Sequence, residues 1–174
     1  MLSNHKHTPI HPVGYRIFAE MNETEKAGRY ERCLQQIEAL TDGESDVIAN
    51  LANIVAVLKN ELGYFWIGFY IVRGNELVLG PFQGTPACVR IARGRGVCGT
   101  CWDTGTTQLV HDVHAFPGHI ACDARSQSEI VVPVRNIDGD VVMVLDLDHD
   151  QPAAFSETDQ RFLEELTRMM QPWV

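Results

Sequence analysis

Residues 65–82, with the sequence FWIGFYIVRGNELVLGPF, contain the pattern that decides the fold. Apolar side chains alternate along the first eight residues, which is the period of a β-strand with one buried face. The turn-forming run Arg73-Gly74-Asn75 follows, and residues 76–82 form a second apolar run. We therefore predict a β-hairpin whose core side carries Phe65, Ile67, Phe69 and Ile71, with Trp66, Gly68 and Tyr70 on the opposite side.

The other predicted elements indicate an α+β domain. A second hairpin is predicted at residues 130–135 and 140–148, around the turn Asn136-Ile137-Asp138-Gly139, with short strands at 88–92 and 108–110. Helical spacing of apolar residues predicts helices at residues 22–40, 47–58, 97–103 and 156–169. The first and the last of these helices begin with the capping pairs Asn22/Glu25 and Ser156/Asp159. Since hairpins connect the strands, the sheet should be antiparallel.

Composition limits the kind of partner. The chain has 174 residues, so we expect a single domain at residues 21–174 after a flexible extension at residues 1–20. The formal net charge of −9 disfavours nucleic acid and anionic membranes, because binding phosphates requires clustered Lys and Arg. The sequence shows no signal peptide and no membrane-spanning run. We expect a cytoplasmic protein whose partners are neutral, cationic or small.

Cysteine usage locates the candidate chemistry. The chain has five cysteines, and a structural disulfide framework is not expected in a reducing cytosol. The segment from Cys88 to Cys122 holds four of them. Cys98 and Cys101 have the spacing of half a zinc or redox motif, but the nearest further ligands, His111, His114, His119 and Cys122, are irregularly spaced. We therefore predict no metal and no cofactor, and favour Cys101 as a small buried side chain.

Cys122 is the candidate nucleophile. It lies in a predicted loop at residues 111–127, and loops of that length in a compact domain are usually functional or disordered. His119 and Arg125 are near it in sequence, and either cation could lower the pKa of the thiol, whereas Asp123 would oppose this. A buried inert cysteine is the usual alternative, but a polar loop is a poor place for one.

Three carboxylates are candidate acids. Asp146 and Asp148 share a predicted strand face with Val142 and Val144, and Glu129 opens the adjoining strand. Buried together, the acids would repel one another, so at least one pKa would rise and keep a proton available near neutral pH. The spacing fits such an acid catalyst and also fits two acids that reach solvent at one end of the sheet.

Two patterns that contain glycine can each be interpreted in two ways, with or without a bound ligand. Residues 94–99, GRGVCG, match the dinucleotide fingerprint, but no parallel crossover follows them. We interpret them as a tight turn at a helix N-terminus, which either holds a ligand carboxylate or has no ligand. Gly68 lies between Trp66 and Tyr70 on the non-core side, which leaves a hollow for a small ligand or marks close packing.

Taken together, several segments resemble the free methionine-(R)-sulfoxide reductases, a catalytic branch of the GAF domains. The resemblance covers roughly residues 24–170, and ordinary GAF sensors lack this trio of cysteines. Its motifs are GPFQG at 80–84, ACVRI at 87–91, GRGVCGT at 94–100, DVH at 112–114, GHIACD at 118–123, SEIV at 128–131 and VLDLD at 144–148. The family implies a six-stranded antiparallel sheet between N-terminal helices and a C-terminal helix, commonly in a homodimer.

The resemblance also implies an activity and roles for single residues. The expected reaction is reduction of free L-methionine (R)-sulfoxide through a sulfenic acid and a disulfide, with thioredoxin as the reductant. Cys122 would be the nucleophile, and Cys88 or Cys98 its disulfide partner. The substrate would contact Trp66, Tyr70, Glu129, Asp146 and Asp148.

The sequence departs from the family pattern in places. Cys101 and Trp102 stand where small residues are expected, so a strained Cys98–Cys101 bond could compete with the expected disulfide. The turn at residues 136–139 is one residue longer than usual. Two other functions stay open: a non-catalytic GAF sensor of a small molecule or of redox state, and a thiol peroxidase in which Cys122 reacts with hydroperoxide.

Overall fold

The protein forms one six-stranded antiparallel sheet, which confirms the predicted α+β class. The structure is a computed structural model that describes residues 21–120 and 122–174; the extension predicted at residues 1–20 lies outside the described residues. The strand order is β3-β2-β1-β6-β5-β4. The strands are β1 (Trp66–Arg73), β2 (Glu76–Gln83), β3 (Arg90–Ala92), β4 (Gln108–Val110), β5 (Ser128–Arg135) and β6 (Val141–His149).

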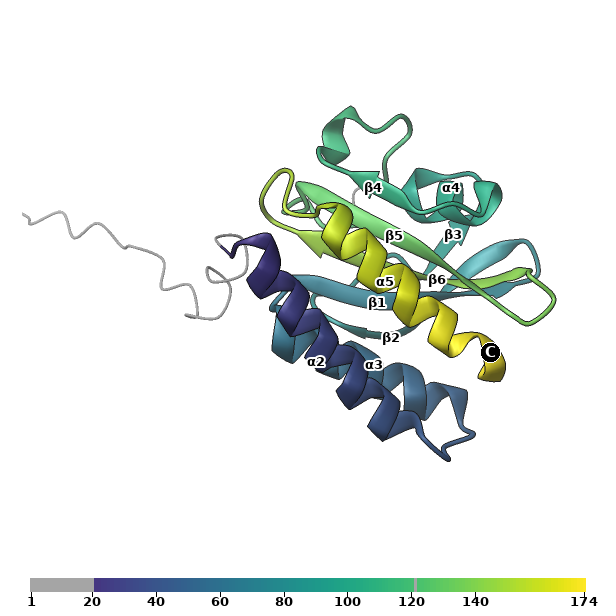
Figure 1. Cartoon of the computed structure of the whole chain (residues 1–174). Coiled ribbons are helices and arrows are strands. Elements are labelled where there is room, and N and C mark those ends of the chain that lie inside the picture. The colour runs from purple at the N-terminus through teal and green to yellow at the C-terminus, as the bar shows by residue number, and fades with distance from the viewer. Residues whose placement is uncertain (1–20, 121) are drawn as a thin grey trace, which may run out of the picture.

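Three long helices cover one face of the sheet (Figure 1). They are α2 (Glu23–Thr41), α3 (Val47–Leu62) and α5 (Glu157–Met170). Both expected capping boxes are present, at Asn22 and Ser156, and Gly63 ends α3 in the left-handed conformation. The larger apolar cluster lies between these helices and the sheet, and includes Ile67 and Phe69 of β1. Among the described residues, no helix has the length and hydropathy needed to cross a bilayer.

A smaller apolar cluster lies on the opposite face, beneath α4 (Gly96–Thr104). Two short 3₁₀ turns complete the elements of residues 21–120 and 122–174: η1 (Val113–Ala115) in the predicted long loop and η2 (Gln171–Trp173) after α5. Phe65 packs in this smaller cluster, so its predicted place on the core side is wrong. The reason is that β1 begins at Trp66, so the alternation of the strand does not extend back to Phe65.

The predicted faces of Val141 and Val142 are also exchanged. Val142 packs with the helix-covered cluster and Val141 with the smaller cluster, although the sequence pattern predicts the reverse. The register between β5 and β6 shifts between Val134 and Arg135, and such a bulge reverses the inside–outside alternation beyond it. Val144 and Asp146 follow the shift along β6, in the regularly paired part of the strand, and keep their predicted face.

A buried polar cluster joins two of the helices to the start of the sheet. The Nζ of Lys26 on α2 lies 2.6 Å from Oδ2 of Asp159 on α5. The hydroxyl of Tyr30 donates to Oδ1 of Asp159 at 2.8 Å, and the hydroxyl of Tyr64 donates to the same oxygen. Asp159 is fully buried, so these donors replace the water that its charge has lost.

Removing this carboxylate should destabilise the whole domain. We expect Asp159→Ala to lower the free energy of unfolding by about 3–5 kcal/mol, because it removes the carboxylate that lies 2.6 Å from the buried Lys26 ammonium group. The matched control is Asp103→Ala, which breaks a solvent-exposed pair with Arg93 and should cost about 1 kcal/mol or less. Urea unfolding under reducing conditions measures both, and equal losses would contradict a stabilising role for the cluster.

Candidate active site

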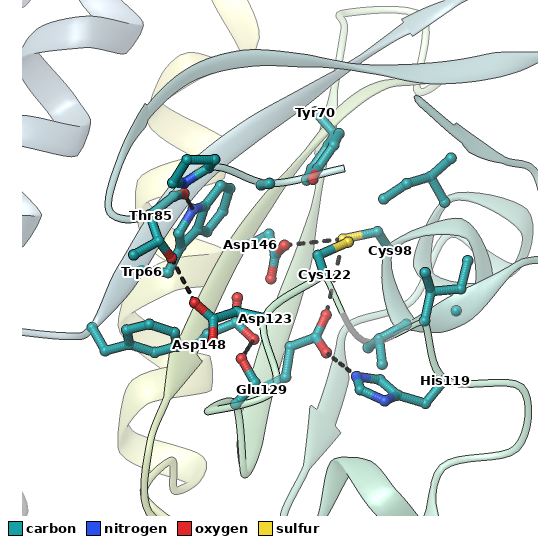
Figure 2. Close-up of a pocket in the computed structure, with 18 of the residues that line it drawn as sticks. Trp66, Tyr70, Thr85, Cys98, His119, Cys122, Asp123, Glu129, Asp146 and Asp148 are labelled. Atoms are coloured by element: carbon teal, nitrogen blue, oxygen red, sulfur yellow. Dashed lines mark hydrogen bonds and ion pairs between the residues drawn. The ribbon is translucent and has the colours of Figure 1, made fainter. Parts of the chain in front are cut away.

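A pocket opens on the sheet face opposite the three long helices, and it contains most of the residues singled out in the sequence (Figure 2). Its floor is formed by β1, β5 and β6, and its walls by the start of α4 and by the loops at residues 84–89 and 111–127. The lining includes Trp66, Tyr70, Cys98, Cys122, Glu129, Asp146 and Asp148. Cys88 is bonded to Cys122 beside this pocket.

Strand register brings the three acids together. Asp148 of β6 pairs with Trp66 on one side and with Glu129 on the other, and Asp146 pairs with Gly68 and Val131. Directly opposed residues on antiparallel strands project from the same face of the sheet. The glycine opposite Asp146 carries no side chain, so the carboxylates lie together beside the aromatic side chains of β1.

Burial keeps protons on these acids. Glu129 and Asp146 are each only 6% exposed, and burial followed by repulsion from the neighbouring carboxylates raises the pKa of both well above the usual range. Burial also raises the pKa of Asp148 to about 6, although the Ser126 hydroxyl donates to its Oδ1 at 2.6 Å and opposes the shift. The cluster is therefore enclosed, and a neutral carboxylic acid is available near pH 7.

Cys98 belongs to the acid cluster. Its Sγ lies 3.2 Å from Oδ2 of Asp146 and 3.9 Å from Oε1 of Glu129. Burial and the charge of Asp146 raise the pKa of this thiol, so it stays protonated and donates to the carboxylates. Cys101 is fully buried, and its Sγ faces the Val131 carbonyl oxygen at 3.5 Å, as expected for a core side chain. Both are free thiols, and the competing Cys98–Cys101 bond is not formed.

A disulfide joins Cys88 to Cys122, whose Cα atoms lie 5.4 Å apart. It connects the loop at residues 84–89 to the loop at residues 111–127. Three hydrogen bonds strengthen this connection: Thr85 Oγ1 donates to Asp123 Oδ2 at 2.8 Å, Trp66 Nε1 to the Thr85 carbonyl at 3.0 Å, and Tyr70 OH to the Cys88 carbonyl at 3.0 Å. The two loops therefore meet over the floor of the pocket.

The cations expected to activate Cys122 have other partners. Arg125 pairs with Asp123 at 2.8 Å and stacks over the ring of Phe65, with its guanidinium carbon 4.8 Å from the ring centroid. These bonds from Arg125 hold the pKa of Asp123 well below its usual range. Burial lowers the pKa of His119, and its Nε2 lies 3.9 Å from Oε2 of Glu129, a contact between two neutral groups. With Cys122 in its disulfide, both side chains therefore contact acidic partners.

The glycine next to the aromatic residues marks close packing, which decides between the two sequence interpretations. A Cβ at Gly68 would lie 2.4 Å from the ring of Trp66 and 2.6 Å from Cβ of Phe82. A Cβ at Gly84 would also lie 2.4 Å from the Trp66 ring. The Trp66 ring therefore occupies the space above Gly68, stacked on Phe82 with the centroids 5.5 Å apart.

The glycine turn before α4 is explained by its own packing. Gly96 has a φ of 60°, and a Cβ at Gly99 would lie 2.5 Å from the Ala92 carbonyl oxygen. The N–H of Gly94 donates to the Gly99 carbonyl at 2.9 Å. These constraints account for the glycines without a dinucleotide. The turn nevertheless places Arg95, Gly96 and Val97 on the pocket wall.

The closed loops leave little room, and one buried oxygen in the pocket lining has no hydrogen-bond partner among the described residues. The free volume of the pocket is about 40 Å³, which suits a few water-sized groups. Oδ1 of Asp146 is buried and has no hydrogen-bond partner among the described residues. Buried carboxylate oxygens are normally paired, so this atom indicates a position for a ligand.

Sequence analysis missed four residues that shape this pocket. Phe65 was assigned to the core, and Thr85, Asp123 and Ser126 were given no place in the site. Thr85 and Ser126 have no motif that would identify them, because each acts through a partner that is distant in sequence: Asp123 for Thr85, and Asp148 for Ser126. Only the tertiary contacts, between the two loops for Thr85 and between a loop and β6 for Ser126, reveal them.

Comparison with known proteins gives a consistent picture. The family model for the GAF domain matches residues 41–170. GAF domain-containing protein A of Dictyostelium discoideum is 49% identical over 87% of this chain and 96% of its own length. The free methionine-R-sulfoxide reductase of Escherichia coli is 43% identical over 87% of this chain and 90% of its own. A free methionine-R-sulfoxide reductase from Neisseria meningitidis, solved with its substrate, is 51% identical with a TM-score of 0.81, covering 84% of this chain and 88% of that one.

The raised pKa of Asp148 predicts a pH-dependent cost in stability. Since its pKa of about 6 in the folded protein exceeds the value near 4 expected in an unfolded chain, wild-type stability falls as pH rises from about 4 to 6. Asp148→Asn removes this loss and keeps an acceptor for Ser126. We expect the variant to be more stable than wild type by roughly 1–3 kcal/mol at pH 7, with no gain at pH 4.

Thermal unfolding between pH 4 and pH 8, with the disulfide intact, measures this difference. Asp103→Asn, at an exposed carboxylate paired with Arg93, is the control and should show no such trend. A difference between Asp148→Asn and wild type that does not change with pH would rule out the buried-acid interpretation.

Proposed function

This chain belongs to the GAF domain family and, within it, to the free methionine-R-sulfoxide reductases, and we propose that it reduces the sulfoxide of free methionine in the pocket beside Cys122. One observation carries the proposal: protonated buried acids lie in the same small pocket as a cysteine that is able to form a disulfide. An acid and a thiol are the two groups that thiol-dependent sulfoxide reduction requires. A non-catalytic sensor requires neither.

The pocket offers complementary surfaces to each end of the substrate. Trp66 and Tyr70 form an aromatic wall suited to the S-methyl group. The neutral acids Glu129 and Asp146 can donate to the sulfoxide oxygen, and the unpartnered Oδ1 of Asp146 supports a ligand there. Asp148, the most readily ionised of the three, suits the ammonium group.

The first chemical step transfers oxygen from the substrate to the enzyme. In the proposed mechanism, the sulfur of Cys122 attacks the sulfoxide sulfur while a neutral acid of the cluster protonates the sulfoxide oxygen. The S–S bond formed by this attack then breaks as the oxygen moves from the substrate sulfur to the sulfur of Cys122. The S–O bond of the substrate is thereby broken, methionine leaves, and Cys122 carries the oxygen as a sulfenic acid. Methionine sulfoxide is reduced by two electrons and Cys122 is oxidised by two. Because protonation makes the sulfoxide sulfur more electrophilic, the step depends less on an activating cation beside Cys122.

The second step restores the enzyme. The thiol of Cys88 condenses with the sulfenic acid of Cys122, forming the disulfide and releasing water. The Cys88–Cys122 bond in the structure supports Cys88 over Cys98 as the partner. Cys98 is a poor partner because its protonated thiol is held by Asp146. A dithiol protein of the thioredoxin class then reduces the disulfide, which fits a reducing compartment such as the cytoplasm.

The closed loops explain why the proposed substrate is free methionine sulfoxide and not a methionine sulfoxide within a protein. With the disulfide formed, the pocket has room for only a few water-sized groups, so substrate entry requires the loops to separate after reduction. Once the loops close over the bound substrate, its amino and carboxylate ends are enclosed. A methionine within a polypeptide is then excluded, because its chain would have to continue through the pocket wall.

The assignment of the nucleophile is tested by Cys122→Ser. We expect turnover of free methionine-R-sulfoxide to fall by more than about a thousandfold, because a serine hydroxyl cannot replace the thiol in attack on sulfur. Oxidation of NADPH in an assay coupled through thioredoxin and its reductase measures the rate. Cys33→Ala is the control, since Cys33 is a buried thiol on the helix-covered face. Retained turnover in Cys122→Ser would reject the mechanism.

Substrate choice separates the proposed function from its alternatives. Wild-type enzyme is assayed with the R epimer, the S epimer and hydrogen peroxide at equal concentrations. We expect turnover with the R epimer alone. Faster turnover of peroxide would indicate a thiol peroxidase, and no turnover of any of the three would favour a sensor.

The role of Cys88 is tested in a single turnover. Cys88→Ser should release one equivalent of methionine and leave Cys122 as a sulfenic acid, because the resolving thiol is absent. Trapping with dimedone, followed by peptide mass analysis, detects this product. In the control Cys101→Ser, the Cys88–Cys122 disulfide should form as in wild type, since Cys101 lies in the core. An intramolecular Cys98–Cys122 disulfide in Cys88→Ser would show that Cys98 can resolve Cys122.

A further inference from the structure

Four donor groups from four parts of the chain converge at one side of the pocket (Figure 2). Ligand atoms of Cys98, Glu129 and Asp146 all lie within 4.8 Å of one another, and all three residues are buried. His119 adds a fourth donor, because its Nε2 lies 3.9 Å from Oε2 of Glu129. One thiol, one imidazole and two carboxylates are the donor types that bind Zn²⁺ in proteins.

The spacing of Cys98 to the two carboxylates, and of His119 to Glu129, is close to that of adjacent ligands in tetrahedral coordination. With Zn–S near 2.3 Å and Zn–O near 2.1 Å, adjacent sulfur and oxygen ligands are about 3.6 Å apart, and nitrogen and oxygen ligands about 3.4 Å. The observed separations from Cys98 Sγ are 3.2 Å to Asp146 and 3.9 Å to Glu129, and the nitrogen–oxygen separation is 3.9 Å. Shifts of about half an ångström, within the reach of side-chain rotation, would complete the geometry.

A second observation indicates a missing ligand at this position. Oδ1 of Asp146 is buried in a residue that is 94% enclosed, and no donor reaches it from the described residues. A divalent cation would satisfy this oxygen and offset the charges of the carboxylates and thiolate, which burial otherwise disfavours. The free volume of about 40 Å³ is ample for a single ion, even with the loops closed by the disulfide.

We propose that Cys98, Glu129, Asp146 and His119 form a binding site for a thiophilic divalent cation of the Zn²⁺ class. Binding forms a metal–sulfur bond to Cys98 and releases the thiol proton, together with any proton on the carboxylates, to solvent. No electron transfer is involved. The site leaves the disulfide-forming pair free, because its ligands do not include Cys88 or Cys122, but it shares Glu129 and Asp146 with the proposed reductase site.

One consequence rests on the proposed function. The cation would occupy the place assigned to the polar end of methionine sulfoxide, so ion and substrate should exclude each other. The cation would then act as a reversible inhibitor that leaves the catalytic disulfide untouched.

The test is a titration with Cd²⁺ of the full chain in its disulfide form. Cd²⁺ replaces Zn²⁺ because a cadmium–thiolate bond gives an ultraviolet charge-transfer band, to which histidines elsewhere in the chain do not contribute. With Cys88 and Cys122 oxidised, the remaining thiols are Cys33, Cys98 and Cys101. We expect one saturable band with a stoichiometry of one ion per chain.

Variants identify the ligands. Cys98→Ser should abolish the band, whereas Cys101→Ser, on the same helix, should retain it. His119→Ala should weaken Cd²⁺ binding by at least about tenfold, because loss even of an outer-shell partner costs about 10–100-fold. His114→Ala, at an exposed histidine of the same loop, should have no effect. Circular dichroism confirms that each variant is folded. Absence of the band in wild type, or an unchanged band in Cys98→Ser, would overturn the proposal.

Discussion

Crowding of three carboxylates on one face of the sheet is the constraint on which the rest of the site depends. Glu129, Asp146 and Asp148 lie on adjacent strands, and water is largely excluded from the first two. Their mutual repulsion, added to burial, favours the protonated forms, so the same groups can donate a proton and hold a polar ligand. The arrangement costs stability, and the donors around it are few: Ser126 to Asp148, and the Cys98 thiol to Asp146.

One face of the sheet carries most of the packing that stabilises the domain, and the opposite face carries the residues of the candidate active site. On the helix-covered face lie the larger apolar cluster and the buried Lys26–Asp159 pair, in which each charge has an opposite partner. The other face carries three crowded acids, the free thiols of Cys98 and Cys101, and Oδ1 of Asp146, which has no hydrogen-bond partner among the described residues. A domain can maintain such an unfavourable face only if the remainder supplies the stability, because the net free energy of folding is small. Active sites commonly concentrate unfavourable groups in this way.

In the proposed cycle, the redox state of Cys88 and Cys122 controls the pocket through its loops. The Cys88–Cys122 bond and the Thr85–Asp123 hydrogen bond hold two loops that come from opposite ends of the sheet order, since the first follows β2 and the second follows β4. Breaking the disulfide removes the covalent connection and leaves the weaker bonds, which permits the loops to open. In the proposed cycle, substrate therefore enters only the reduced enzyme, which already has a free thiol for the reaction.

The sequence by itself determined the elements and the composition of the site. Strand alternation, capping pairs and turns predicted the antiparallel α+β sheet, and the clustered cysteines and strand acids marked the candidate residues, because these signals are local along the chain. Tertiary structure decided what depends on distant partners. The bulge between Val141 and Met143 exchanged the faces of Val141 and Val142. Arg125 formed an ion pair with Asp123, and the Trp66 ring filled the space above Gly68. Burial and distance, which set the pKa of each acid and the pairing of each thiol, arise only when separate segments pack together, so no local pattern encodes them.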